Sequence, residues 1–306
     1  MPGSSRLLFA GGIASLVFLA VHTGKVARAA FVGALVLATL IPCTFLTILW
    51  NRVRYIWPYA PGWFVLVACL GAALGHVLSR LIKEQSTVPA LVTGIYAGLL
   101  GSKLKWSVED LANSSRAITE QQVKLGVWAR ENLPQDALIG LNDTGAIAYF
   151  SERRTFDVVG LTTESEARYW VAGAGSRYEH YEAMPREALP THFIVYPGWF
   201  GIPSLLGEEL YEATVLNQSI LGGASKVAYR ADWSVLGRGA RPTTLDRTAA
   251  IADELDVSDL ESEAAHEYVF YDATERDNLV RTDWNADGED VCDAGRFVRH
   301  EDSFVL

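Results

Sequence analysis

The chain has 306 residues, half of which are hydrophobic, and its 36 Asp and Glu outnumber 26 Lys and Arg to give a formal net charge of −10. Residues 1–106 hold nine basic residues and one acid, which leaves a net charge of about −18 for the remainder. Nucleic-acid binding requires clustered Lys and Arg, so the acidic remainder excludes a nucleic-acid partner. The three cysteines predict no disulfide framework.

The first third of the chain contains four apolar segments with the composition of membrane helices. They are Leu7–Val21, Ala29–Trp50, Gly62–Ile82 and Val88–Leu104. The first could alternatively be a signal peptide, because Arg6 precedes it and Ala27-Arg28-Ala29 is similar to a cleavage site. A second apolar segment follows at once, which favours a membrane helix. Residues 1–106 are therefore predicted to form a transmembrane helical region, whose orientation the positive-inside rule does not decide.

The predicted loop Asn51–Trp63 combines two arginines with several aromatic residues. Aromatic residues are typical of the membrane interface and need no further function there. Arg52 and Arg54, beside Tyr55, could in addition bind a lipid phosphate, because a guanidinium group makes paired hydrogen bonds with phosphate oxygens. The sequence leaves both interpretations open.

From Ser107 the sequence becomes polar, and Ser107-Val-Glu-Asp110 predicts a capping box at the start of a helix that extends to about residue 132. Leu111, Ile118 and Leu125 recur at intervals of seven residues. This spacing predicts that one face of the helix packs against the following domain.

The centre of the chain predicts a strand at Leu138–Leu141, a short helix at Ala146–Phe150 and a second strand at Thr155–Val159. Such a unit needs apolar partners on its faces. We therefore expect residues 107–240 to form a soluble α/β domain with a mixed sheet.

Further strands are predicted at His192–Tyr196, Ala213–Leu216 and Val227–Trp233. Thr163–Ala183 is expected to contain loop and short helix. Pro197–Pro203 is expected to lack regular structure because it is rich in Pro and Gly.

Residues 241–306 are strongly acidic, with short predicted strands at Val269–Tyr271, Phe297–Val298 and Phe304–Leu306. No complete core is visible in them. We interpret this stretch as an acidic, partly β tail that begins a further β-rich module, and we expect that module to be cut off at the C-terminus.

Several charged residues of the central unit are candidates for a substrate site. Asp143 follows the first strand and precedes the short helix, so its simplest role is a helix N-cap and a substrate contact is the alternative. Arg153, Arg154 and Asp157 could form an ion network or the wall of a ligand site. The sequence does not separate these possibilities.

Asp283-Trp-Asn-Ala-Asp-Gly288 matches the first half of a calcium-binding loop, in which Asp283, Asn285 and Asp287 would bind a divalent cation. The twelfth position of such a loop requires a bidentate Glu and is Ala294 here, so a plain hairpin turn is favoured. The six histidines form no zinc pattern, and no phosphate-binding loop or hydrolase motif occurs.

Two stretches resemble a family of membrane enzymes. Arg54-Tyr-Ile-Trp-Pro-Tyr-Ala-Pro61 is similar to the loop before a late membrane helix in GT-C type glycosyltransferases, which transfer sugars from polyprenyl-phosphate donors. Asn142–Tyr149 and Phe156–Leu161 are similar to the start of the C-terminal extracytoplasmic domain of bacterial members, including arabinosyl- and aminoarabinose-transferase-like proteins. The resemblance covers about residues 51–233.

The resemblance implies that the chain is the C-terminal portion of an integral membrane glycosyltransferase of the inner or plasma membrane. Its acceptor would be a cell-envelope glycan or lipid, its C-terminal domain would be extracytoplasmic, and Arg54 and Tyr55 would lie near the lipid phosphate. The family's catalytic acid is in the first outer loop, whereas His22–Arg28 contains no acid. We therefore expect this chain to lack the catalytic residue. The alternative is a non-catalytic, membrane-anchored module that binds a glycan or a protein.

Overall fold

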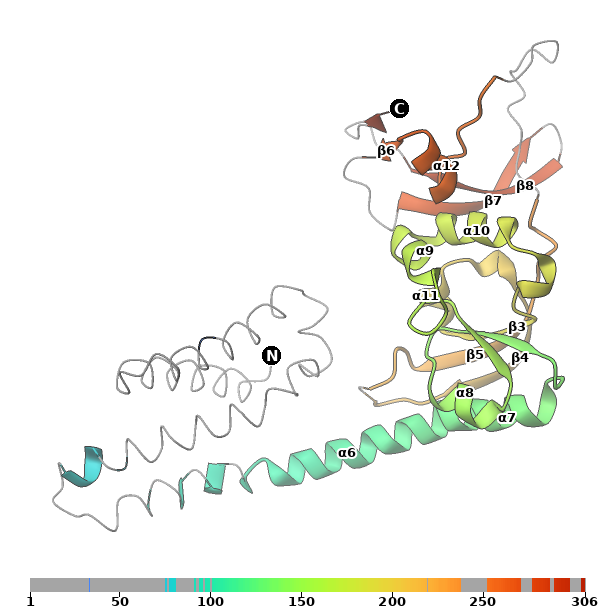
Figure 1. Cartoon of the computed structure of the whole chain (residues 1–306). Coiled ribbons are helices and arrows are strands. Elements are labelled where there is room, and N and C mark those ends of the chain that lie inside the picture. Colours follow the sequence, from blue (N-terminus) through green and yellow to red (C-terminus); the bar gives the residue numbers. More distant parts are fainter. Residues whose placement is uncertain are drawn as a thin grey trace. The chain divides into compact units, whose positions relative to one another are not determined.

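The computed structural model describes residues 101–218, 220–237, 252–270, 277–286, 289–297 and 304–305, with isolated helical positions at 33, 75, 77–80, 91, 94–95 and 97–99 (Figure 1). The predicted membrane segments fall almost entirely outside these residues. Among the described residues, no helix combines the length and the apolar composition that crossing a bilayer requires. The chain divides into two compact units, Met1–Leu111 and Ala112–Leu306. The second unit contains the α/β domain.

A long helix leads into the α/β domain. It consists of α6 (Leu104–Ile118), the π-helical turn η2 (Thr119–Val123) and α7 (Lys124–Asn132), which follow one another without a break. The prediction of a capping box was wrong, because the N–H of Ser107 donates to the carbonyl of Lys103 at 2.9 Å and Ser107 therefore lies inside the helix.

The apolar face of this helix packs only in its second half. Leu125 and Ala129 are fully buried and Leu133 nearly so, whereas Leu111 is 69% exposed. The seven-residue spacing thus predicted the packing of α7 correctly. It did not predict the exposure of Leu111 near the start of α6.

The domain contains a mixed, five-stranded sheet with the order β2-β1-β3-β5-β4. Strand β1 pairs in parallel with β2 and β3, and β5 pairs antiparallel with β3 and β4. The predicted α/β class with a mixed sheet is confirmed. The strands are β1 (Leu138–Leu141), β2 (Arg154–Asp157), β3 (His192–Val195), β4 (Leu206–Thr214) and β5 (Ser225–Ala231).

The sequence located β1, β2, β3 and β5 but only the end of β4. Strand β4 lies at an edge of the sheet and has the sequence LGEELYEAT, in which most side chains are exposed or partly exposed. An edge strand pairs on one side only and often carries charges, so it lacks the apolar pattern of a buried strand.

Helices connect the strands and cover the sheet (Figure 1). Two predictions need correction here. Thr163–Ala183 forms two helices separated by Gly173, whose φ of 126° is open to glycine. Pro197–Pro203 is not irregular, because Pro197 occupies the first position of a short helix, where its missing N–H costs nothing. The helices are α8 (Ala146–Ser151), α9 (Glu166–Ala172), α10 (Ala174–Ala183) and α11 (Pro197–Phe200), with 3-10 turns at Arg186–Ala188 and Pro203–Leu205.

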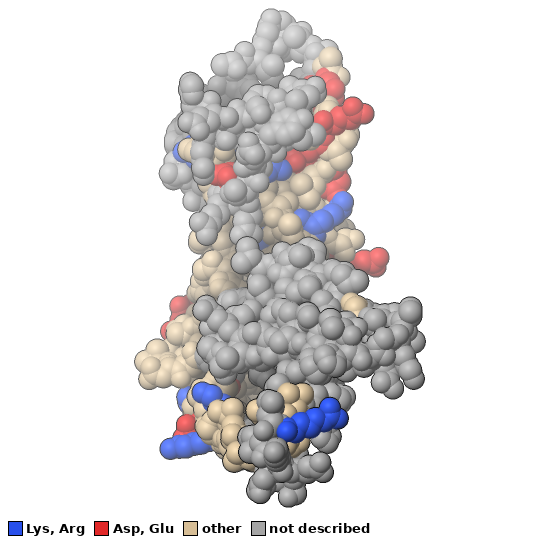
Figure 2. All heavy atoms as spheres, turned by 90° about the vertical axis from the view of Figure 1, so that its left-hand side faces the viewer, with Lys and Arg blue, Asp and Glu red and all other residues tan. Residues whose placement is uncertain are grey.

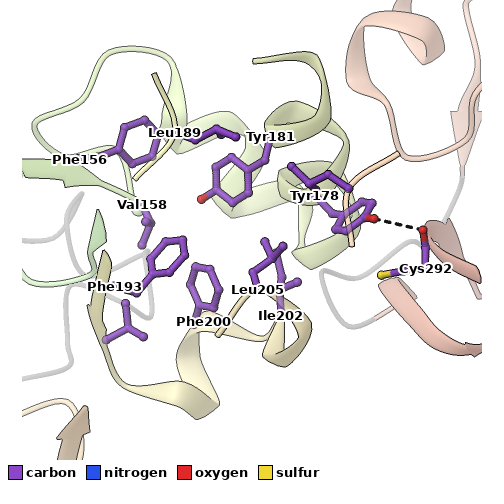
Figure 3. Packing of buried hydrophobic residues seen from close by; sticks show 12 residues of the cluster. Phe156, Val158, Tyr178, Tyr181, Leu189, Phe193, Phe200, Ile202, Leu205 and Cys292 are labelled. Atoms are coloured by element: carbon purple, nitrogen blue, oxygen red, sulfur yellow. Dashed lines mark hydrogen bonds between the residues drawn. The ribbon is translucent and has the colours of Figure 1, made fainter. Parts of the chain in front are cut away.

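Two apolar clusters fill the domain, one on each face of the sheet. Ile139 and Leu141 of β1 contribute to the cluster beneath α7 and α8. Gly140, between them, faces the other cluster, where a Cβ atom would come within 2.4 Å of the ring of Phe193. Figure 3 shows this second cluster, in which the rings of Phe193 and Phe200 lie 4.8 Å apart.

The acidic C-terminal stretch contributes a helix and two strand pairs. The predicted strands at residues 269–271 and 304–306 are confirmed, whereas β8 ends before the one predicted at Phe297. Strand β6 pairs with β9, and β7 pairs with β8 as a hairpin. The elements are α12 (Leu260–Ala265), β6 (Val269–Phe270), β7 (Asn278–Ala286), β8 (Glu289–Arg296) and β9 (Phe304–Val305).

The hairpin packs on α10 through polar contacts. The Oδ1 atom of Asn278 accepts from the backbone N–H of Ser176 at 3.1 Å, and its Nδ2 atom donates to the hydroxyl of Ser176 at 2.7 Å. The hydroxyl of Tyr178 donates to the carbonyl of Cys292 at 3.1 Å (Figure 3). These contacts attach the hairpin to the α/β domain.

The described part of the face drawn in Figure 2 carries Lys and Arg side chains scattered among acidic ones. They do not gather in one patch there. This part of the surface therefore produces no concentrated positive potential.

Arg153 stabilises the end of α7. Its guanidinium group donates to the carbonyls of Arg130, Leu133 and Pro134 at 2.7, 3.0 and 2.8 Å. The last carbonyl groups of a helix have no N–H partner within the helix, and these three carbonyls lie at that end of α7. The side chain therefore has a structural role at the start of β2.

We predict that Arg153→Ala lowers the free energy of unfolding by about 1.5 to 3 kcal/mol, because it removes hydrogen bonds from a charged donor. Thermal unfolding of the purified chain, followed by near-ultraviolet circular dichroism, measures the change. Arg154→Ala is the matched control, since Arg154 makes one long contact of 3.4 Å to the carbonyl of Asp136. Equal effects of the two substitutions would contradict the assigned role of Arg153.

Candidate ligand-binding site

The carboxyl ends of β1, β2 and β3 meet at one edge of the sheet, which we call the carboxyl edge. Strand β1 lies between β2 and β3. After β1 the chain forms β2 on one side of it and then crosses over to form β3 on the other side. Open α/β sheets bind ligands at such a reversal of strand order, because the loops diverge there and leave room. The start of the antiparallel strand β5 lies at the same edge.

A hydrogen-bonded network of five residues occupies the carboxyl edge. The Oδ2 atom of Asp143 lies 3.3 Å from Nζ of Lys226 and accepts from Nε2 of Gln122 at 3.2 Å. The same Gln122 nitrogen donates to the hydroxyl of Tyr196 at 2.9 Å, and this hydroxyl donates to Oε1 of Gln121 at 2.7 Å. We call these residues the Asp143 network.

The π-helical turn η2 supplies the two glutamines. Successive residues of an α-helix point about 100° apart, so two neighbours rarely face the same buried surface. Gln121 and Gln122 are nevertheless 0% and 5% exposed, because the wider turn directs both towards the sheet. Gln121 also donates to the carbonyl of Ala224 at 2.8 Å and so fixes the loop between β4 and β5.

Lys226 is the buried charge of the network. Its side chain has no exposed surface, and this burial lowers its pKa to about 8, although Asp143 opposes the shift. Its Nζ atom also lies 4.5 Å from the ring centroid of Tyr196. Burial, followed by the negative charge of Asp143, raises the pKa of Tyr196, so its hydroxyl stays protonated at neutral pH.

Two further polar residues at the edge differ in how their groups are satisfied. Asp157 is buried and accepts from the backbone N–H groups of Leu161 and Thr162, both at 2.8 Å, so it shapes the loop after β2. Asn142 is 4% exposed, and neither its amide oxygen nor its amide nitrogen has a hydrogen-bond partner within the described part of the chain. Because both atoms are inaccessible, a buried water molecule is the partner that would satisfy them.

Trp199 lies beside the network with part of its ring exposed. Its ring centroid is 5.3 Å from that of Tyr196, and 40% of the residue is accessible to solvent. Gly222 allows this position, because a Cβ atom there would lie 2.7 Å from both rings. The neighbouring Phe200 is fully buried.

The structure separates the predicted substrate residues. Asp143 lies at the carboxyl edge, whereas Arg153 and Arg154 lie at the opposite end of β2 and contact backbone carbonyls. The prediction that Asp143 caps α8 was wrong, because Gly145 holds the cap position and no side chain bonds to it. The predicted phosphate ligands, Arg52, Arg54 and Tyr55, lie outside the described residues.

The predicted calcium loop falls within the β7–β8 hairpin. Asp283 and Asn285 belong to β7, and the pairing of Ala286 with Glu289 agrees with the favoured hairpin turn. The positions of the side chains of Asp283 and Asn285, and Asp287 as a whole, lie outside what the structure describes. Within the described residues, no group of His, Cys, Asp and Glu side chains has an arrangement that could hold a metal ion.

Sequence reasoning did not identify Gln121, Gln122 or Lys226. Two consecutive glutamines in an amphipathic helix were the available signal, because they interrupt the seven-residue pattern. Lys226 directly precedes the apolar residues Val227 and Ala228 of the predicted strand, which was a second signal. Neither signal reveals which residues these side chains contact, since the contacts join residues about 80 to 100 positions apart in sequence.

The model of a domain of unknown function, DUF8728, matches residues 115–271. The chain belongs to this family. The DUF8728 match includes η2, the entire sheet and the Asp143 network. No curated protein and no solved structure matches the chain.

Asp143 gives the network a partly exposed carboxylate. Its side chain is 45% exposed, and its Oδ2 atom contacts Lys226 and Gln122. It also interacts with the hydroxyl of Tyr196. The amine of Lys226 is inaccessible, so Asp143 is the charged group of this pair that a ligand can reach.

We predict that the stability of the wild-type chain rises relative to Lys226→Met between pH 8 and about 10.5. In this range the unfolded state still holds the lysine proton and the folded state has released it, so raising the pH favours folding. The full difference is roughly 3 kcal/mol. Urea unfolding of both proteins across this range measures it.

Lys124→Met provides the control, because Lys124 is an exposed lysine of α7. Its stability should follow the wild-type pH dependence. A constant difference between the wild type and Lys226→Met from pH 7 to 10.5 would show that Lys226 is not a buried, deprotonating amine.

Proposed function

We propose that the chain is part of an integral membrane glycosyltransferase that transfers a sugar from a polyprenyl-phosphate donor to an extracytoplasmic acceptor. The resemblance of the loop around Arg54 and of the β1–α8–β2 unit to GT-C type enzymes supports this proposal. The acceptor would be a cell-envelope glycan or lipid.

One observation carries the proposal for the α/β domain. The helix that inserts Gln121 and Gln122 into the carboxyl edge is continuous with α6, and α6 begins in the last apolar segment of the sequence. The carboxyl edge therefore lies beside the helix through which the chain enters the α/β domain. Such an arrangement suits a domain that covers a membrane-linked substrate.

The second candidate is a non-catalytic module that binds a glycan or a protein. Its support is that both carboxylates of the carboxyl edge are already engaged: Asp143 by Lys226, and Asp157 by backbone N–H groups. The absence of an acid from His22–Arg28 favours it as well. Binding of labelled polyprenyl phosphate by membranes that contain this chain distinguishes the candidates, because a module that recognises only a glycan or a protein binds none. Sugar transfer does not distinguish them, since this chain is expected to lack the catalytic residue.

For donor recognition, we predict that Arg54→Ala weakens binding of polyprenyl phosphate by about tenfold or more, because an arginine–phosphate pair contributes roughly 1.5 to 3 kcal/mol. Arg54→Lys should recover only part of the affinity, since lysine lacks the planar fork. Equilibrium binding in detergent measures both effects.

Arg80→Ala and Lys83→Ala are the controls, because these residues lie on the opposite side of the membrane in the proposed topology. Neither should change the affinity. If all four substitutions behave alike, Asn51–Trp63 is an ordinary interfacial loop and donor recognition through it is wrong.

For localisation, we predict that the α/β domain is extracytoplasmic. The side chain of Glu208 is 63% exposed. A cysteine introduced there as Glu208→Cys should react with a membrane-impermeant maleimide in intact cells. Cys292 is buried and should remain unlabelled, and the unsubstituted chain gives the background. Labelling that requires permeabilised cells would place the domain in the cytoplasm.

A further inference from the structure

We propose that the carboxyl edge of the DUF8728 domain binds one neutral sugar ring, with Trp199 beneath the ring and Asp143 accepting hydrogen bonds from its hydroxyl groups. The inference deepens the proposed function and rests on it, because it assigns the sugar of the acceptor to this domain.

The aromatic platform is the first part of the argument. A sugar ring has a face of C–H groups, which packs against an aromatic ring, and a rim of hydroxyl groups. Trp199 is 40% exposed and lies against Tyr196, whose hydroxyl is bonded to Gln122. Gly222 holds no side chain that would push the indole away. An accessible aromatic surface thus lies next to the polar groups of the network.

The carboxylate is the second part. Asp143 is held at Oδ2 by Lys226 and by Gln122, at 3.3 and 3.2 Å. Two partners from different elements fix its orientation before a ligand arrives, which reduces the entropy lost on binding. Its carboxylate is 45% exposed, and an ionised carboxylate accepts hydrogen bonds and donates none. It therefore selects ligands that donate, and sugar hydroxyl groups do so.

The charge of the site selects against a phosphate. Lys226 neutralises Asp143 but is fully buried, so an incoming anion would meet the carboxylate and not the amine. Asp157, a second carboxylate at the same edge, is also buried. The other three members of the network are two amides and a phenol. This composition fits a neutral, hydroxyl-rich ligand.

Asn142 is the fourth observation, and it is independent of the network. Its amide is buried without a hydrogen-bond partner in the described part of the chain, and it directly precedes Asp143. Buried amides are almost always paired. Both amide atoms are inaccessible to solvent, so their missing partner points to a buried water molecule at the opening of the sheet rather than to a direct contact with the sugar.

The test is a titration of the full chain in detergent with methyl glycosides of a pentose and of hexoses, followed by saturation-transfer difference NMR. We expect saturation with a dissociation constant in the millimolar range for at least one glycoside, and no competition by inorganic phosphate. Trp199→Leu and Asp143→Asn should each weaken binding by about tenfold. Because Asp143→Asn leaves Lys226 without its partner, the exposed Trp199→Leu keeps the test valid if the first variant does not fold.

Trp106→Leu is the matched control, because Trp106 is an exposed tryptophan of α6 that precedes the network by more than three helical turns. It should leave glycoside binding unchanged. Absence of glycoside binding overturns the inference, as does competition by phosphate. The chain has nine tryptophans, so the fluorescence of Trp199 is the part that Trp199→Leu removes. If brominated lipid in nanodiscs quenches this part, the edge contacts the bilayer and the inference is also wrong.

The outcome for the proposed function is measured separately. Binding of polyprenyl phosphate with no glycoside binding would contradict the sugar site and leave the proposed transferase intact. Glycoside binding with no binding of polyprenyl phosphate would support the sugar site as a binding module and reject the transferase.

Discussion

The domain depends on the burial of the Lys226 ammonium group at the end of the sheet. Removing a charged amine from water is costly, and the cost is tolerable only because a carboxylate and an aromatic ring lie within 3.3 and 4.5 Å of it. Asp143 in turn is held by Gln122. The entering helix, the strand order and the loop between β4 and β5 are thus joined through one set of polar contacts. A change in any of them changes the orientation of Asp143.

The regular parts of the fold followed from local patterns. Strands β1, β3 and β5 lie in the interior of the sheet and consist largely of apolar residues, so their sequence alone indicated them. The heptad of Leu125 predicted the packing of α7 for the same reason. Edge strand β4 could not be found in this way, because its charged side chains face solvent. The hairpin β7–β8 was seen only as a turn, since its strands carry many polar residues.

The candidate site was less accessible to sequence reasoning. Asp143 was singled out for its place after a strand, but the partner that defines it is Lys226, 83 positions further along the chain. Arg153 and Arg154 were chosen because they are charged and close in sequence, whereas β2 carries them to the other end of the sheet. The π-helical turn was hidden, because periodicity treats a helix as uniform. Local sequence therefore indicated which elements exist, and topology decided which side chains meet.

The contact between α10 and the hairpin has a consequence for where the folded unit ends. The family match stops at residue 271, yet Asn278 fills the space beside Gly175 so closely that a Cβ atom there would lie 2.0 Å from its Oδ1 atom. Tyr178, buried beneath the hairpin, bonds to the carbonyl of Cys292. Cutting the protein at the family boundary would bring these groups into water. The segment that matches the family, residues 115–271, is therefore shorter than the folded domain, because the β7–β8 hairpin is also needed to keep α10 out of contact with solvent.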